Sequence, residues 1–327
     1  MKVLVTGATG YLGRQVCEVL REKSFEFTAV SRSPQNESEF TQGNILNAEG
    51  LTELCSGHDV LIHSAGLVSH TEEDSQRVWQ IHVQGTQNIL RAAKEAGIRR
   101  VIYLSTSGTI AVHTKDEPIA TEESPSPFPL IKEWPYYRSK LFAEQIALAS
   151  NAPDFEVICL NPSLLLGPGD TVDGVSTKSV RMFLDDELPV APSGGIAFVD
   201  VRDVALMVVD CIQKGTPGSR YLLNGANMSF LNFYQKIARI SDKNPPILQM
   251  PKFTRKALGW IPNWKKIGEN VGMTLERHDV LLASHFWYVD DTKARKELDW
   301  EPRDPLQTLE DTIKEIKDRE DNFSPWA

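Results

Sequence analysis

Cysteine is scarce in this sequence, with four residues among 327. They lie far apart, none forms a Cys-x-x-Cys pair, and none has a histidine at metal-ligand spacing. Their positions are Cys17, Cys55, Cys159 and Cys211. This pattern argues against a disulfide framework and a zinc site, and we assign no metal to the chain. We expect four small buried thiols in a reducing compartment.

Long hydrophobic runs and an excess of positive charge are also missing. No stretch approaches the roughly 18 apolar residues of a membrane span, and the apolar run in 1–7 is too short for a signal peptide. Lys and Arg number 35 against 44 Asp and Glu, and the net charge of −9 would repel nucleic acid and anionic membranes. We therefore expect a cytoplasmic protein with a small-molecule partner and neither a nucleic-acid nor a membrane partner.

What the sequence does contain is a regular alternation of strand and helix patterns in its first half. Apolar runs predict strands at 2–6, 26–31, 60–64, 100–105 and 156–161, and helical spacing occupies 11–23, 78–96 and 136–150. Parallel strands need such crossover helices. The fold class predicted is α/β, a Rossmann-type doubly wound parallel sheet with a smaller C-terminal α/β substrate lobe.

The alternation breaks down after about residue 161, which suggests the domain division. We expect an NAD(P)-binding Rossmann domain over 1–162, to which the chain returns near 196–225 and 286–291. The remainder of 163–327 would form mainly the substrate lobe.

A glycine-rich turn joins the first predicted strand to the first helix. It reads Thr6-Gly-Ala-Thr-Gly-Tyr-Leu-Gly13. Gly7 suits a tight turn, Gly10 lets the backbone approach a pyrophosphate, and Gly13 allows close packing of helix on strand, while the helix N-terminus attracts anions. The turn therefore predicts a dinucleotide site that also includes Thr9, Tyr11 and Leu12.

The end of the second predicted strand bears on the choice of cofactor. A carboxylate there binds the adenosine ribose hydroxyls, but this strand ends in Ser31 and Arg32, and a guanidinium suits a 2′-phosphate. We therefore favour NADP(H) and leave NAD(H) open. Asn44 and Ile45 lie further along the chain, before the predicted strand at 60–64. They could bracket the adenine, although an ordinary polar loop would explain them equally well.

A tyrosine and a lysine four residues apart form the candidate reactive pair. Tyr136 and Lys140 fall on one face of the predicted helix. A phenol needs a nearby cation to act as an acid or base near neutrality, and the Lys140 ammonium could also bind the nicotinamide ribose. The hydroxyls in 105–108, at the carboxyl end of a strand, lie where ligands bind in open α/β sheets.

Together these motifs resemble the extended short-chain dehydrogenase/reductase superfamily, also described as the NAD-dependent epimerase/dehydratase family. Further segments that carry the resemblance are VLIHSAG at 60–66, NPSLLLGPGD at 161–170, FVDVRDVA at 198–205 and TKARKELDWEP at 292–302. Within it, YYRSKLFAEQ at 136–145 and RYLLNG at 220–225 look most like the dihydroflavonol-4-reductase-like branch.

The resemblance implies roles for the residues that match its motifs. Tyr136 would donate the proton, Lys140 would support it, and Thr106 would polarise the carbonyl oxygen, with Ser107 as the fallback. The cofactor would also contact four residues that follow the predicted strands at 60–64 and 156–161. These are Ala65, Gly66, Pro162 and Ser163.

Three positions depart from the family pattern. His82 stands where the family commonly has Asn, and Val68 where epimerases can carry Lys. Ser107-Gly108 stands where 4,6-dehydratases carry an acidic pair. We therefore prefer an NADPH-dependent reductase of a ketone or aldehyde on a small to medium metabolite. A nucleotide-sugar epimerase or dehydratase with retained NAD and a non-catalytic NADP-sensing protein are the alternatives. A homodimer formed through the helix of Tyr136 is left open.

Overall fold

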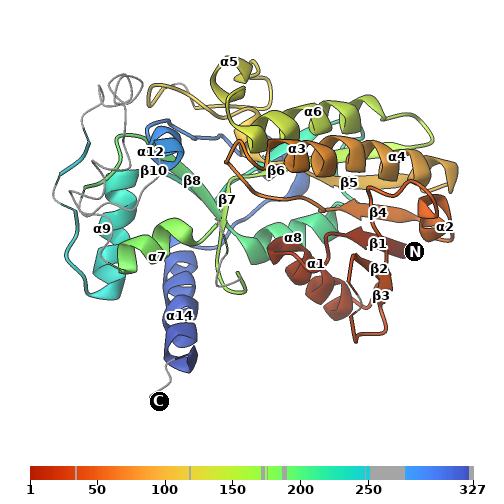
Figure 1. The fold of residues 1–327 in the computed structure, drawn as a ribbon, viewed down its shortest axis with the longest axis horizontal. Helices are drawn as coiled ribbons and strands as arrows, with labels where there is room; N and C mark the ends of the chain where they lie inside the picture. The colour runs from red at the N-terminus through yellow and green to blue at the C-terminus, as the bar shows by residue number, and fades with distance from the viewer. Residues whose placement is uncertain are drawn as a thin grey trace.

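A parallel sheet of seven strands forms the centre of the protein in the computed structural model (Figure 1). The structure describes residues 1–33, 35–117, 119–170, 174, 176–185, 190–246, 248–250 and 277–323. In spatial order the strands are β3 (Phe40–Gln42), β2 (Glu26–Ser31), β1 (Lys2–Thr6), β4 (Val60–His63), β5 (Arg100–Leu104), β6 (Glu156–Pro162) and β9 (Arg220–Leu223). All neighbours pair in parallel, so the doubly wound sheet expected from the sequence is confirmed.

The central strands are apolar throughout because both faces of the sheet are covered. In β1, Val3 and Val5 pack into the core under α1 (Tyr11–Glu22) and α8 (Val201–Asp210), whereas Leu4 faces the opposite core. That second core lies under three other helices (Figure 1). They are α2 (Leu51–Cys55), α4 (Gly85–Glu95) and α6 (Pro135–Ala149). Successive side chains point to opposite faces of a strand, which explains this division. All four cysteines are buried thiols in these cores.

One helix of the sequence prediction is interrupted. The pattern over 78–96 predicts a continuous helix, but the chain forms α3 (Ser75–Trp79), a π-helical turn at Gln80–Gln84, and then α4. Such turns accommodate an extra residue in a helix and occur frequently at functional sites. The turn contains His82, and periodicity alone does not reveal it.

A smaller lobe is built around a second sheet of three strands. Its order is β10 (Ala226–Ser229), β8 (Gly195–Asp200) and β7 (Leu164–Leu166). The segment expected to return to the Rossmann domain therefore divides, because β8 belongs to the small sheet and β9 to the large one. Residues Phe286 and Val289 bridge to His113 and Ala120, so the second expected return lies against the loop after β5.

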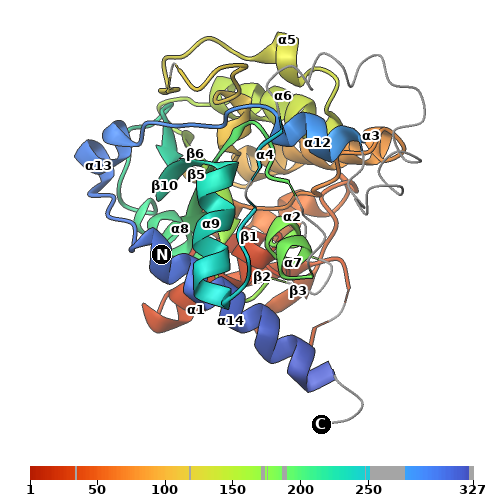
Figure 2. The ribbon, with the colours of Figure 1, turned by 90° about the vertical axis from the view of Figure 1, so that its left-hand side faces the viewer.

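Helices surround the small sheet (Figure 2). They are α7 (Lys178–Leu184), α9 (Phe230–Ser241), α12 (Arg277–Ala283) and the C-terminal α14 (Pro305–Phe323). Shorter helices elsewhere are α5 (Phe128–Ile131) and α13 (Thr292–Leu298). Within the described ranges no helix is long and apolar enough to cross a membrane.

Candidate active site

A cavity of about 420 Å³ lies at the carboxyl ends of the central strands, between the large sheet and the smaller lobe. Ligands bind at this edge of open α/β sheets because the loops there diverge at the change of strand direction. Eleven residues selected from the sequence line it. They are Gly7, Gly10, Tyr11, Leu12, Gly13, Gly66, Thr106, Tyr136, Lys140, Pro162 and Ser163.

The other residues selected from the sequence lie outside the lining of this cavity. Thr9 is in the glycine turn, and Ala65 follows Ser64, which does line the cavity. Ser31 is buried at the end of β2, and Arg32 beside it is exposed. The Arg32 guanidinium forms no ion pair with another residue in the described parts of the chain.

Asn44 and Ile45 follow β3 and differ in their surroundings. The Asn44 side chain accepts a hydrogen bond from the backbone of Leu46 at 3.0 Å, so it also stabilises its own turn. Ile45 is buried, and its side chain occupies the space beside Gly85 of α4. The Ile45 side chain therefore packs against α4 inside the protein.

The glycine turn is shaped to admit a ligand's phosphates. A Cβ at Gly7, where φ is +75°, would lie 2.6 Å from the nitrogen of Ala65, and one at Gly13 would lie 2.1 Å from the oxygen of Gly7. Gly10 precedes α1 in extended conformation and offers no capping side chain, so the first N–H groups of the helix remain for an anion. The residues present therefore fit a dinucleotide pyrophosphate.

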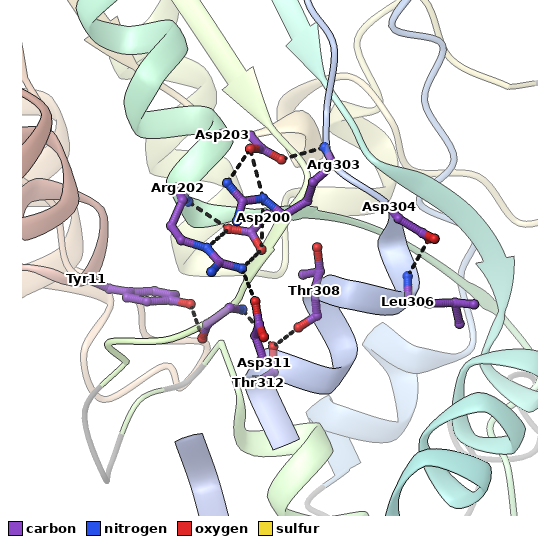
Figure 3. A network of polar contacts seen from close by, with 11 residues as sticks. Tyr11, Asp200, Arg202, Asp203, Arg303, Asp304, Leu306, Thr308, Asp311 and Thr312 are labelled. Carbon is purple, nitrogen blue, oxygen red and sulfur yellow. Dashed lines mark hydrogen bonds and ion pairs between the residues drawn. The ribbon is translucent and has the colours of Figure 1, made fainter. Parts of the chain in front are cut away.

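A polar network fixes the glycine turn to the C-terminal helix (Figure 3). The Tyr11 hydroxyl donates to the oxygen of Gly167 at 2.7 Å, and the nitrogen of Gly167 donates to the Thr312 hydroxyl at 2.8 Å. Nearby, Arg202 of α8 pairs with Asp311 of α14 at 2.6 Å. The smaller lobe and the cofactor end of the cavity are thus held together directly.

The three side chains expected to be reactive line the same cavity. Thr106 follows β5, and its hydroxyl acts on the Tyr136 phenol by lowering the pKa of that phenol. Lys140 lies one turn further along α6, buried, with its Nζ donating to the oxygen of Leu104 at 2.7 Å. The two hydroxyl groups therefore converge in the cavity where a carbonyl oxygen would be polarised.

Burial governs the protonation of this centre. It raises the pKa of Tyr136 to about 12, and the Thr106 hydroxyl lowers that pKa only in part. Burial also lowers the pKa of Lys140 to about 8, while Cys159 and Glu144 act in the opposite direction. The Lys140 ammonium donates to a backbone oxygen, and its support of the Tyr136 phenolate stays a prediction.

An aromatic wall adjoins the reactive centre, and the sequence analysis missed it. Tyr137 stacks on His70 with ring centroids 5.5 Å apart and packs against Trp287 at 4.8 Å. The rings of His70 and Tyr136 pack edge to face, with their centroids 5.6 Å apart. The wall combines three distant segments, and the only signal in the sequence is the second tyrosine of the Tyr136-Tyr137 pair.

The substrate end of the cavity is mainly apolar. Its walls include Met182, Ile196, Phe230, Tyr234 and Leu282. Lys178 also lines it, but its ammonium is paired with Asp279 at 3.0 Å. In the described part of the lining, no unpaired cation is therefore offered to a substrate at this end.

Comparison with known proteins identifies the family. The model of the NAD dependent epimerase/dehydratase family matches residues 3–223, which include the glycine turn and the Thr106, Tyr136 and Lys140 set. The chain belongs to this family. It is an NAD(P)-dependent oxidoreductase of the extended short-chain dehydrogenase/reductase type.

Members of the family with known names or structures resemble this chain over nearly its whole length. A Synechocystis sp. protein named "Putative dihydroflavonol 4-reductase" is 27% identical over 94% of this chain and 92% of its own. The crystal structure of gox2253 superposes with a TM-score of 0.84 at 24% identity, covering 97% of this chain and 98% of that one. UDP-glucuronic acid 4-epimerase from Bacillus cereus in complex with NAD gives 0.75 at 20% identity over 100% of both chains.

Position 82 departs from the family pattern, and the structure shows what the histidine does. The backbone nitrogen of Leu67 donates to Nε2 of His82 at 3.1 Å, so Nδ1 carries the proton and donates to the Ser139 hydroxyl at 2.8 Å. Burial lowers the pKa of His82 well below its ordinary value, which keeps the ring neutral. His82 thus joins the loop after β4 to the helix that carries Tyr136 and Lys140.

Proposed function

We propose that this protein is an NADPH-dependent reductase of a ketone or aldehyde on a small to medium metabolite with an apolar body. The observation that carries the proposal is that Thr106, Tyr136 and Lys140 line one cavity, beside the aromatic wall. A phenol with a pKa of about 12 holds its proton at neutral pH and is in the form that a reduction consumes.

The reaction divides between cofactor and protein. A bound reduced nicotinamide supplies the electron pair to the carbonyl carbon. Thr106 holds and polarises the carbonyl oxygen, Tyr136 gives it a proton, and the Lys140 ammonium binds the ribose and then favours the phenolate that remains. The glycine turn with the α1 N-terminus would hold the pyrophosphate, and Pro162 and Ser163 would lie by the carboxamide.

NADP(H) is preferred in the proposal because of the end of β2. Arg32 is exposed there, no acid stands beside it, and a guanidinium suits a 2′-phosphate. Ser31, Asn44 and Ile45 would line the same adenosine end, and Thr9 and Ala65 would border the phosphates and ribose.

A nucleotide-sugar epimerase that retains NAD is the second candidate, since the chain superposes on an epimerase. Two features of the cavity disfavour it. A sugar diphosphate needs cations, and Lys178 is already paired with Asp279. An acid at 108, as in dehydratases, would collide with Tyr137. A non-catalytic NADP sensor is disfavoured because Thr106, Tyr136 and Lys140 are all present in the site.

The proposal also covers the partners, the location and the assembly of the protein. The partner would be a small molecule in the cytoplasm, with no nucleic acid or membrane involved. Phe142 of α6 and Phe128 are exposed, and their ring centroids lie 6.2 Å apart. Together they form an apolar surface suited to a second copy of the chain. Light scattering of the wild type and of Phe142→Glu tests this, since a dimer through α6 should dissociate in the variant.

The decisive experiment has two steps. NADPH and NADH are titrated into the protein by fluorescence, and a panel of carbonyl compounds with apolar rings and of UDP-sugars is then followed at the nicotinamide absorbance. We expect exchangeable NADPH that is consumed by some ring-bearing carbonyl. We also expect Tyr136→Phe to lower turnover by about 10² to 10⁴ with cofactor binding retained. Tightly retained NAD without net consumption would favour the epimerase instead.

A further inference from the structure

Glu144 is a buried carboxyl group to which the reaction above gives no task. It lies on α6 one turn beyond Lys140 and is 1% exposed. Its Oε2 accepts hydrogen bonds from Asn161 at 2.7 Å and from the hydroxyls of Thr109 at 2.8 Å and Ser105. Its Oε1 accepts from Arg220 at 3.0 Å. Four donors satisfy a carboxylate and leave no acceptor for the proton of a carboxylic acid.

Two of these donors also hold the backbone of Thr106. The Thr109 hydroxyl lies 2.9 Å from the oxygen of Thr106, and Nδ2 of Asn161 lies 3.1 Å from the same oxygen. Asn161 has two N–H donors and serves Glu144 and the Thr106 oxygen together, whereas the one proton of the Thr109 hydroxyl is shared between these two acceptors. Glu144 therefore holds both groups beside the Thr106 carbonyl. Its network joins α6 to β6, to β9 and to the segment after β5 that carries Thr106.

The charge of Glu144 also acts on Lys140. Among the described residues, the titratable groups that interact with the ammonium besides Glu144 are the neutral rings of His63 and His82, the Tyr103 ring and the Cys159 thiol. Tyr136 lines the same cavity, and Arg220 is paired with Glu144. Burial raises the pKa of the Cys159 thiol well above its ordinary value and so keeps it neutral. Glu144 is thus the anion that favours the charged form of Lys140.

We propose that Glu144 is a positioning residue with two effects on the site. It holds Thr106 in place through Thr109 and Asn161, and its negative charge favours the ammonium form of Lys140. The inference rests on the proposed reduction.

The charge is tested with Glu144→Gln, which keeps the shape of the side chain. The Lys140 ammonium is the active form, so the rate falls as pH rises through the pKa of Lys140. Loss of the carboxylate lowers that pKa, and we expect the alkaline limb of kcat/KM to move to lower pH by about one unit. Arg220→Met removes the partly exposed cation that is paired with Glu144, and it should move the limb to higher pH. A limb at the wild-type pH in either folded variant overturns the electrostatic part.

The geometry is tested with Thr109→Val, which is nearly isosteric and keeps the charge on Glu144. It removes one hydroxyl that links the carboxylate to Thr106. We expect kcat to fall about tenfold, the effect of losing one buried hydrogen bond, at an unchanged KM for cofactor and an unmoved alkaline limb. A wild-type kcat in Thr109→Val overturns the positioning of Thr106.

A second readout separates this inference from the proposed reduction. The affinity for NADPH, measured by fluorescence against pH, depends on the Lys140 ammonium and needs no substrate. If the wild type reduces no carbonyl, the proposed function fails. The inference about Glu144 still holds in that case if the pH above which NADPH affinity falls is lower in Glu144→Gln than in the wild type. An unshifted limb in that measurement overturns the charge coupling by itself.

Discussion

The ring of Tyr137 fills the space that any side chain at position 108 would need. A Cβ at Gly108 would lie 2.2 Å from Cε1 of Tyr137 and 3.2 Å from the ring of Trp287. Tyr137 cannot move away freely because it is packed against His70 and Trp134 as well. The glycine therefore belongs to the aromatic wall, and an acidic residue at position 108 would be incompatible with it.

This relationship predicts the effect of Gly108→Ala. The added methyl group must displace the Tyr137 ring, and overpacking of this kind costs about 1–3 kcal/mol. We expect a lower melting temperature and a raised KM for substrate, measured by thermal unfolding and steady-state kinetics. Tyr137→Phe is the matched control, because it keeps the ring and should keep both values near the wild type. Wild-type stability of Gly108→Ala would show that the ring is free to move.

The cofactor preference is tested at Arg32. If its guanidinium meets the 2′-phosphate, Arg32→Asp should weaken NADPH binding by about 10- to 100-fold, the worth of a charge-assisted hydrogen bond, and should leave NADH binding equal or better. Arg91→Asp, on the exposed side of α4, changes the net charge equally and should alter neither affinity. An unchanged ratio of the two dissociation constants in Arg32→Asp would remove Arg32 from the site.

The sequence was sufficient for five of the seven strands of the large sheet, and β3 and β9 were not among the predicted strands. Buried on both faces, β1, β4, β5 and β6 are continuous apolar runs, and their observed bounds differ from the predicted ones by at most one residue. The π-helical turn at Gln80–Gln84 escaped prediction because one extra residue hardly disturbs a helical pattern.

The site was predictable where one local motif carries it. The glycine turn and the Tyr136-Lys140 pair each lie within a few residues, so spacing alone places them. The aromatic wall unites His70, Tyr137 and Trp287 from three loops and helices, and only tertiary packing brings such residues together. The same limit applies to Glu144, whose donors come from β6, β9 and the segment after β5.

His82 provides a test of the loop after β4. His82→Phe keeps an aromatic ring beside Tyr136 but loses the hydrogen bonds to Leu67 and Ser139. Each buried group left without a partner costs about 1–3 kcal/mol, so we expect at least tenfold weaker NADPH binding by fluorescence titration. His82→Asn, which restores the commoner family residue with a donor and an acceptor, should retain more affinity. Equal affinities in the two variants would show that the hydrogen bonds at this position do not shape the cofactor site.

The pH dependence of the wild-type reaction follows from Lys140. Its pKa is lowered to about 8 by burial, so the ammonium is present below this pH and is lost as the pH rises through it. Tyr136 keeps its proton up to about pH 12 and contributes nothing to this limb. We therefore expect kcat/KM for reduction to fall above about pH 8. Lys140→Arg retains its cation throughout this range, so even a slower variant should show no decline. A limb near pH 8 that persists in Lys140→Arg would belong to another group and would separate Lys140 from the titration.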